Sequence, residues 1–125
     1  MAALATLLMA MSIALKSENN MEKKKNVKAV EIVIFSFKEK YSDQPASEKA
    51  MLVNDFISNQ SGFISRTTSK LDGDKWIDIV YWESMQEAKD ANGAAMKCEP
   101  CGAFFNSINQ EPMQFMHGET FVEIR

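Results

Sequence analysis

Residues 63–82, with the sequence FISRTTSKLDGDKWIDIVYW, decide the fold because they contain two strand-like runs on either side of a tight turn. Phe63–Leu71 and Trp76–Trp82 are rich in β-branched and aromatic residues, a composition typical of strands. Asp72-Gly73 between them is a strong short-range signal for a β-hairpin. This stretch therefore predicts two neighbouring antiparallel strands.

A third strand and a helix are predicted before the hairpin. Val27–Lys38, with the sequence VKAVEIVIFSFK, has the same strand-like composition. Ser42, Asp43 and Pro45 then form a helix-start signature. We expect the helix to end near Ser61-Gly62, where glycine stops it. Apolar residues recur between these points at helical spacing, namely Ala46, Ala50, Val53 and Ile57, with Leu52 and Phe56 widening the stripe.

A second helix and a last strand are predicted after the hairpin. Ser84-Met85-Gln86-Glu87 is a capping box that starts the helix Ser84–Lys97. We expect Pro100 to break it, Gly102–Ile108 to form a short helical piece, and Met113–Ile124 to form the strand, with a bulge near Gly118. The predicted buried face of the helix consists of Met85, Ala88, Asn92, Ala95 and Met96. The order βαββαβ predicts an α+β, ferredoxin-like fold with a four-stranded antiparallel sheet and both helices on one face.

Composition limits the kinds of function that are possible. The chain has 125 residues and a formal net charge of −3, which indicates one domain and argues against a nucleic-acid partner. His117 is its single histidine, so a multi-histidine metal centre is excluded, and we expect neither a metal nor another cofactor. Two cysteines are too few for a chain-wide disulfide framework.

The first 26 residues are expected to lie outside the domain, which we place at residues 27–125. Met1–Leu15 carries no charge, is short for a membrane-spanning helix, and has the length of the apolar part of a signal peptide. No basic segment precedes it and no clean small-residue cleavage site follows it. A non-structural extension, an export signal and a membrane anchor all stay open. We expect a cytoplasmic protein without stable membrane association, with export as the alternative.

The two faces of the predicted sheet differ in chemistry. One face, formed by Val30, Ile32, Ile34, Ile77, Ile79 and Tyr81, is almost pure hydrocarbon, and we expect it to lie beneath the helices. The other face is too aromatic for water and too polar for a dry core unless its charges are paired. A second copy of the sheet packed on that face would form a homodimer with a cavity. The mixed face comprises Glu31, Val33, Phe35, Phe37, Arg66, Thr68, Trp76, Asp78, Val80, Trp82, Phe115, His117, Glu119 and Phe121.

Cys98 and Cys101 have the Cys-x-x-Cys spacing of redox motifs. In thioredoxin-like proteins that motif follows a strand and opens a helix, whereas here it follows a predicted helix. We therefore favour a buried packing role for Cys101 over redox or metal chemistry. Export of the chain would make a local disulfide more plausible.

Several stretches within residues 28–125 resemble the antibiotic-biosynthesis monooxygenase (ABM) domain family of the dimeric α/β-barrel superfamily. They are VEIVIFSFK in the first strand, SGFISR entering the second, DGDKWIDIVYWES through the third, and CGAFFNSI and MQFMHGETFVEI near the end. The resemblance implies a ferredoxin-like domain that pairs as a dimeric α/β barrel. It also implies oxidation of polycyclic phenols or hydroquinones by O2 without metal or flavin. Related haem-degrading monooxygenases use a histidine on the second helix, and Ser84–Lys97 contains none.

Two polar residues are candidates for catalysis. His117 can act as the base that forms an electron-rich phenolate, since its ordinary pKa lies near neutrality. The alternative is a hydrogen-bonded histidine at a dimer interface. Arg66 can stabilise an oxyanion, and its alternative is a salt bridge to Glu31 or Asp78.

The candidate substrate-binding residues are mainly aromatic and can form a wall for a flat ligand, although ordinary core packing explains them equally well. They are Phe35, Trp76, Asp78, Trp82, Phe104 and Phe115. Asn92, on the inner stripe of the second helix, can also bind or simply hydrogen-bond locally.

Two functions from different classes fit the sequence. The first is a cofactor-independent monooxygenase-like enzyme that acts on a small aromatic or quinol-type molecule, in a cavity between the sheet and helices of a homodimer. The second is a non-catalytic dimer that binds a small apolar ligand or has a purely structural role. In both cases the expected partners are a second copy of the chain and a small hydrophobic or aromatic molecule.

Overall fold

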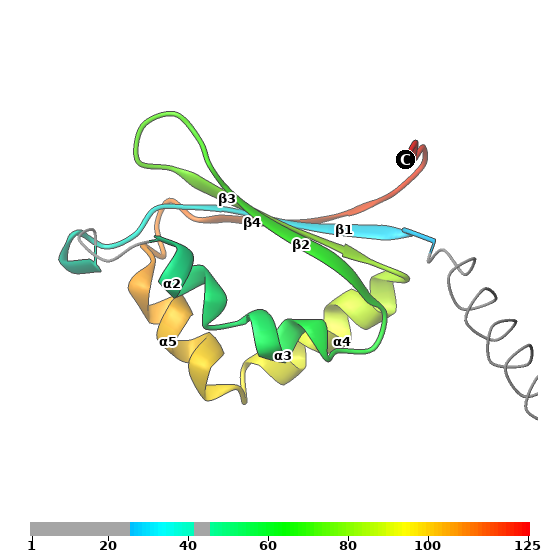
Figure 1. Ribbon diagram of the computed structural model, residues 1–125, viewed down its shortest axis with the longest axis horizontal. Helices are drawn as coiled ribbons and strands as arrows, with labels where there is room; N and C mark the ends of the chain where they lie inside the picture. Colours follow the sequence, from blue (N-terminus) through cyan, green and yellow to red (C-terminus); the bar gives the residue numbers. More distant parts are fainter. Residues whose placement is uncertain (1–25, 42–45) are drawn as a thin grey trace, which may run out of the picture.

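The computed structural model describes residues 26–41 and 46–125 and has two layers (Figure 1). One layer is the β-sheet, and the α-helices all lie on one side of it. The uncharged segment Met1–Leu15 and the predicted helix start at Ser42, Asp43 and Pro45 lie outside the described residues. In chain order the elements are β1 (Ala29–Phe35), η1 (Glu39–Tyr41), α2 (Ala46–Met51), α3 (Asn54–Ser58), β2 (Phe63–Lys70), β3 (Trp76–Trp82), α4 (Met85–Ala95), α5 (Glu99–Ser107) and β4 (Gln114–Glu119).

The sheet has the strand order β2-β3-β1-β4, and each neighbouring pair is antiparallel. β1 is therefore an inner strand, with Glu31 opposite Val80 of β3 on one side and opposite His117 of β4 on the other. This order, with helices on one face, is the predicted ferredoxin-like α+β fold.

Local signals in the sequence are confirmed at the hairpin and at the start of α4. Gly73 has a positive φ of 76°, which favours glycine, and the Leu71 N–H donates to the Lys75 carbonyl at 2.9 Å to close the turn. Ser84 is the N-cap of α4, and its Oγ accepts a hydrogen bond from the Glu87 N–H at 3.1 Å. Both features fix the chain direction where the sequence predicts it.

The first predicted helix is divided into α2 and α3. In a continuous helix the Ala50 carbonyl would accept the N–H of Asn54. Here the Arg66 Nη1 donates to the Ala50 carbonyl at 2.7 Å and to Asn54 Oδ1 at 2.9 Å. The break therefore coincides with the place where a strand arginine bonds to the helix backbone.

Three further details differ from the sequence prediction. Pro100 does not break a helix but lies in the first turn of α5, where its missing N–H costs nothing. β4 stops at Glu119 and pairs with β1 in unbroken register through Gly118; the irregularity in the sheet lies in β2, between Phe63 and Ser65. Met96, expected to be buried, follows the last residue of α4 and is 89% exposed.

The prediction of which sheet face lies beneath the helices is wrong. The aliphatic residues Val30, Ile32 and Ile34 are only partly buried, whereas Glu31 and Asp78, on the mixed face, are buried under the helices. Hydrocarbon content suggested the opposite arrangement. The mixed face can be buried because its charged groups pair with one another. We call the other, aliphatic face the open face.

The core beneath the helices consists of two apolar clusters. One contains Ala29, Val80, Trp82, Ala88 and Ala91. The other contains Phe35, Val53, Cys101, Phe104 and Ile108. Between them along the strands lies a set of polar side chains that we call the polar belt, comprising Glu31, Arg66, Thr68, Asp78, Asn92 and His117.

Within residues 26–41 and 46–125, no helix is long and apolar enough to cross a membrane.

Candidate functional site

His117 lies at one end of the polar belt, between a carboxylate and an amide. β1 and β4 place Glu31 and His117 directly opposite each other on the inner face of the sheet. Glu31 Oε2 lies 3.0 Å from His117 Nε2, and Asn92 Nδ2, which comes from α4, lies 3.2 Å from the same ring nitrogen. The side chains of His117 and Glu31 are only 17% and 8% exposed. A strand pair and a helix thus hold one imidazole nitrogen in a shielded, polar environment.

Burial changes the acidity of Glu31. Removal of the carboxylate from water raises the pKa of Glu31 above its ordinary value of 4.5, and the neighbouring Asp78 charge acts in the same direction. Hydrogen bonds from His117 and Asn92, together with the attraction of the His117 charge, oppose this rise without cancelling it. Glu31 therefore holds a proton more readily than an exposed glutamate does.

The geometry allows Glu31 and His117 to share a proton. When Nε2 is protonated, it donates to Glu31 Oε2; when it is not, it accepts the N–H of Asn92 or the proton of a neutral Glu31. These arrangements differ only in the presence or position of one proton, and they need no movement of the backbone. A shielded group of this kind can accept a proton from a bound hydroxyl group.

Arg66 lies at the other side of the polar belt and is held by Asp78. The Arg66 Nε lies 2.9 and 3.0 Å from the two Asp78 carboxylate oxygens, and its Nη2 lies 2.8 Å from Oδ2. Thr68 Oγ1 donates to Asp78 Oδ1 at 3.0 Å. Because Arg66 Nη1 also bonds to Ala50 and Asn54, most of the fork of donors serves internal contacts. The geometry matches the predicted alternative of a salt bridge to Asp78.

The predicted aromatic residues do not form a single wall. Phe35, Trp76 and Phe104 belong to the cluster at one end of the sheet, where Phe37 makes edge-to-face contacts with all three. Trp82 lies in the other cluster, and its ring packs edge-to-face against Phe63 at 6.0 Å.

Phe115 is the predicted aromatic residue that lies beside the histidine. Its ring centroid is 5.1 Å from that of His117, in an edge-to-face arrangement, and Phe115 is 47% exposed. It therefore offers an apolar surface next to the candidate base.

Trp82 carries an unsatisfied polar atom. Its side chain is fully buried, and among the described residues its indole Nε1 has no hydrogen-bond partner. Leaving such a donor unpaired costs about 1–3 kcal/mol.

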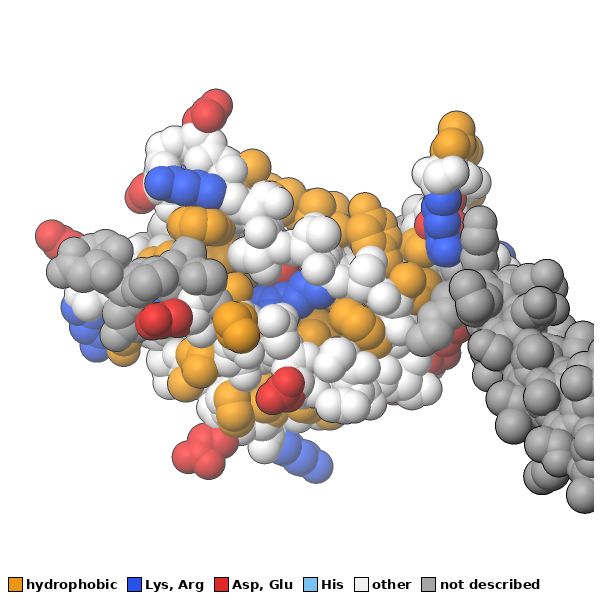
Figure 2. Space-filling view, viewed as in Figure 1, with side chains coloured by type: hydrophobic (Ala, Val, Ile, Leu, Met, Phe, Trp, Pro, Cys, Tyr) orange, Lys and Arg blue, Asp and Glu red, His pale blue; other side chains and the backbone are white. Residues whose placement is uncertain are grey.

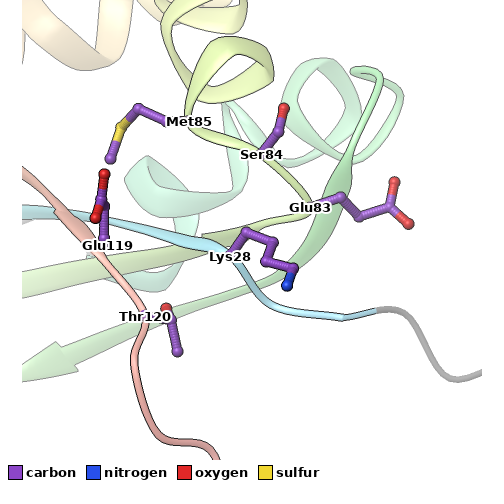
Figure 3. Close-up of a pocket in the computed structure, with 6 residues that line it drawn as sticks. All are labelled: Lys28, Glu83, Ser84, Met85, Glu119 and Thr120. Atoms are coloured by element: carbon purple, nitrogen blue, oxygen red, sulfur yellow. The ribbon is translucent and has the colours of Figure 1, made fainter.

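A surface hollow of about 330 Å³ lies beside the start of β1 and the end of β4 (Figure 3). It is lined by Lys28, Glu83, Ser84, Met85, Glu119 and Thr120. Its lining includes none of the predicted site residues, and its polar groups form no acid–base pair like that of Glu31 and His117. We therefore place the candidate site at the polar belt.

The described residues offer no ready metal site. Within residues 26–41 and 46–125, no group of three His, Cys, Asp or Glu side chains is arranged to hold a metal ion. His117 uses Nε2 for Glu31 and Asn92.

Sequence reasoning brought together part of this site. It placed Arg66, Asp78 and His117 on one face of the sheet, and the structure has them there. It expected that face to lie between two sheets, whereas in the structure the face lies beneath the helices. It treated Glu31 only as a charge partner, and it left open whether Asn92 binds a ligand or only hydrogen-bonds locally. Helical spacing placed Asn92 on the inner stripe of α4, and strand alternation placed Glu31 and His117 on one face. A cross-strand pairing of Glu31 with His117 was the signal that could have joined them.

The chain is similar to known proteins at the level of structure. No family model matches the chain, and none of the curated proteins matches it. SnoaB, a cofactor-independent oxygenase from Streptomyces nogalater, is a similar solved structure, with 16% sequence identity and a TM-score of 0.56, covering 80% of this chain and 97% of SnoaB.

Two other solved structures illustrate the same likeness. A monooxygenase from the gene ActVA-Orf6 of Streptomyces coelicolor, solved with nanaomycin D, has 21% identity and a TM-score of 0.56, covering 79% of this chain and 92% of that protein. A dimeric ferredoxin-like protein from an uncultured marine organism has 10% identity and a TM-score of 0.54, covering 84% and 97% of the two chains.

These similarities define the class of protein by its fold. The chain is a ferredoxin-like α+β domain of the kind found in cofactor-independent monooxygenases and in dimeric ferredoxin-like proteins. The resemblance to ABM domains in the sequence is thus confirmed for the fold. Activity must be argued from the site itself, since one fold supports many functions.

Proposed function

We propose that this chain is a cofactor-independent, monooxygenase-like enzyme that oxidises a small aromatic, quinol-type molecule bound between the sheet and the helices. The observation that carries the proposal is the shielded group of Glu31, His117 and Asn92. Buried charge is expensive and contributes little to stability, so a polar belt that divides the core is better explained by chemistry than by folding.

In the proposed reaction, His117 removes the proton of a bound phenolic hydroxyl group. The Glu31 carboxylate stabilises the positive charge that develops on the imidazole. The resulting phenolate is electron-rich enough to react with O2. One oxygen atom enters the substrate, and the other leaves as water with two hydrogens from the substrate. The substrate also supplies the two electrons that reduce this second oxygen atom to water, so the reaction balances without a further reductant.

Phe115 and Trp82 are the aromatic residues that we assign to substrate contact. Phe115 supports the proposal because its ring packs against His117 and remains partly exposed. Trp82 supports it through its unpaired indole N–H. In this proposal Arg66 contributes a fixed positive charge near the site, while Asp78 holds it in place.

We also propose that the chain acts as a homodimer that pairs through the open face. This face consists of partly buried and exposed residues without a charged side chain, and a patch of this type favours association. A two-fold axis would place the same face on both partners. Its members are Val30, Ile32, Ile34, Ser65, Thr67, Ser69, Ile77, Ile79, Tyr81, Gln114, Met116 and Gly118.

The C-terminal tail supports pairing on that side of the sheet. Phe121, Val122 and Ile124 are 89%, 83% and 93% exposed. In Figure 1 the tail rises from the sheet on the side away from the helices. Hydrophobic side chains line the same side of the molecule between the β2–β3 hairpin and the tail (Figure 2). A second copy is the occupant that would cover the sheet face and the tail together.

One observation favours the alternative of a non-catalytic, ligand-binding dimer. The Arg66 guanidinium already makes contacts with Asp78, Ala50 and Asn54, which leaves it poorly suited to stabilising a substrate oxyanion. In that alternative, the aromatic side chains bind a small apolar molecule and His117 has only a structural role.

The test is oxygen uptake by the full chain with a panel of hydroquinones and polycyclic phenols. We expect uptake with at least one compound, and a loss of about 100-fold or more in rate for His117→Ala, in keeping with the contribution of a general base. Glu31→Gln should lower the rate and move the pH profile. Lys89→Ala, an exposed change on the same helix as Asn92, is the matched control and should leave the rate unchanged.

Two results would overturn the proposal. Uptake that persists in His117→Ala would remove the base from the mechanism. Binding of the compounds by a folded dimer that shows no uptake above background would establish the ligand-binding alternative.

A further inference from the structure

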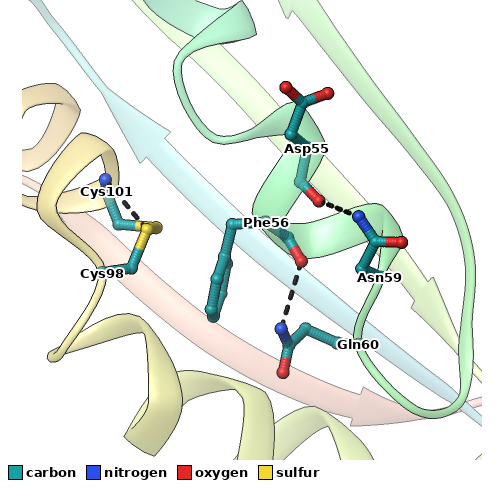
Figure 4. Close-up of a disulfide and its surroundings, with 6 residues drawn as sticks. All are labelled: Asp55, Phe56, Asn59, Gln60, Cys98 and Cys101. Carbon is teal, nitrogen blue, oxygen red and sulfur yellow. Dashed lines mark hydrogen bonds between the residues drawn. A yellow bond between two sulfur atoms is a disulfide. The ribbon is translucent and has the colours of Figure 1, made fainter.

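Cys98 and Cys101 follow α4, as the sequence predicts, but they also open α5. Cys98 is the N-cap of α5, with an extended backbone, and its sulfur accepts a hydrogen bond from the Cys101 N–H at 3.3 Å. The two residues are joined by a disulfide, and Figure 4 shows the pair at the start of the helix. A Cys-x-x-Cys pair whose first member caps a helix is the arrangement that redox-active cysteines use.

The two cysteines differ in how deeply they are buried. Cys101 is 8% exposed and belongs to the apolar cluster that contains Phe35 and Phe104. Cys98 packs against the same cluster but is only partly buried, and it is followed by the exposed residues Glu99 and Pro100. Cys98 is therefore the less buried of the two cysteines and the one nearer to solvent.

A purely structural role explains this disulfide poorly. Its loop contains only Glu99 and Pro100, and closing so short a loop removes little freedom from the unfolded chain. The start of α5 is already stabilised by the Cys98 cap and by Pro100 in the first turn. Metal binding lacks support as well, since no cluster of three potential ligands occurs in the described segments.

We propose that Cys98 and Cys101 form a redox-active dithiol/disulfide site, with Cys98 as the sulfur that exchanges with small external thiols and disulfides. This site is separate from the polar belt and does not depend on the proposed oxygenase activity.

Each step of the exchange can be written with its atoms and electrons balanced. A thiolate of an external dithiol attacks Cys98 Sγ, the bond between the two protein sulfurs breaks, and Cys101 leaves as a thiolate that takes up a proton. The second thiol of the reagent then attacks the mixed disulfide and releases Cys98. The reagent is oxidised to its disulfide, and the protein gains two electrons and two protons. The released Cys98 thiolate is stabilised by the Cys101 N–H and by the N-terminal end of the helix dipole.

The first test follows the redox state of the full, folded chain in buffers of reduced and oxidised dithiothreitol. Acid-quenched samples are alkylated and analysed by mass spectrometry, while circular dichroism monitors the fold. We expect complete and reversible conversion with an unchanged spectrum. In the reduced protein, iodoacetamide should label Cys98 at least about tenfold faster than Cys101. Reduction that requires urea, or equal labelling of the two residues, would overturn the proposal.

A second test uses single-cysteine variants and glutathione disulfide. Cys101→Ser keeps the outer sulfur and should form a mixed disulfide with glutathione. Cys98→Ser keeps the shielded sulfur and is the matched control, which should not react while folded. Equal reaction of both variants, or of neither, would contradict the assignment of Cys98. If a variant fails to fold, the labelling ratio in the wild-type chain still decides the question.

Discussion

Glu31 and His117 face each other across the β1–β4 pair, and 3.0 Å separates Glu31 Oε2 from His117 Nε2 although 86 positions separate the two residues in the chain. The pair lies beneath the helices, where a carboxylate loses most of its hydration. Desolvation outweighs the favourable contacts and leaves the pKa of Glu31 raised. The stability of the protein should therefore depend on pH in a manner that Glu31 controls.

We expect the wild-type chain to lose free energy of unfolding, relative to Glu31→Gln, as the pH rises above 4.5. Below this value Glu31 is neutral in both states, and its contribution to stability is fully present. As the pH rises, the unfolded chain loses this proton first, so the contribution disappears as the pH passes through the raised pKa of the folded state. Urea titrations of both proteins at a series of pH values measure the difference. Parallel curves across the series would contradict the prediction.

A second prediction concerns Arg66 and Asp78, whose side chains are only 5% and 11% exposed. Asp78→Leu alone should cost about 3–5 kcal/mol, because it leaves a buried guanidinium without its partner. The double variant Arg66→Met/Asp78→Leu should lose less than Asp78→Leu does. Urea denaturation of Arg66→Met, Asp78→Leu and the double variant gives the coupling energy between the two side chains.

The control for this pair is the exposed contact between Arg125 and Glu123, whose side chains are 39% and 34% exposed. Arg125→Met should change stability by less than about 1 kcal/mol, since surface ion pairs contribute little. If the buried and exposed pairs cost the same, burial does not govern the Arg66 contact.

A third prediction tests pairing through the open face. Ile79 lies on β3 in the middle of this face, so Ile79→Lys would place a charge in the proposed interface. We expect the wild-type chain to be a dimer at micromolar concentration and Ile79→Lys to be a folded monomer by light scattering. Ala103→Lys adds the same charge to the exposed surface of α5 and should remain a dimer. A monomeric wild-type protein would contradict the proposed assembly.

A fourth prediction separates two glycines. Gly62 has a φ of 80°, and a Cβ there would overlap the Glu87 side chain. Gly62→Ala should therefore cost at least about 1–2 kcal/mol. Gly93 lies within α4 with open space around it, so Gly93→Ala should add about 0.5–1 kcal/mol. Thermal unfolding should lower the midpoint for the first variant and raise it for the second; equal shifts would refute the argument.

The order of strands and helices was predictable because local signals determine it. β-Branched runs gave the strands, Asp72-Gly73 gave the hairpin, and Ser84 with Glu87 gave the start of α4. Pro100 was misjudged because proline both ends one helix and starts another, and only the three-dimensional path of the chain distinguishes the two.

The choice of the buried sheet face was not predictable from hydrophobicity. A face with Glu31, Asp78 and Arg66 looks unsuitable for a core when each residue is considered alone. Pairing removes that objection, but the pairs join residues on different strands, and their geometry follows only from the register. The division of the first helix has the same origin, because Arg66 reaches the Ala50 carbonyl from β2.

The inner position of β1 has a consequence for the newly synthesised chain. β1 comes first of the four strands in chain order, yet it needs β3 on one side and β4 on the other to satisfy its backbone. Glu31 is synthesised before the other three strands, whereas its partner His117 lies on the last of them. A nascent chain that has not yet released β4 exposes the edge of β1 together with an unpaired carboxylate. The Glu31–His117 pair is therefore complete only when β4 has joined the sheet.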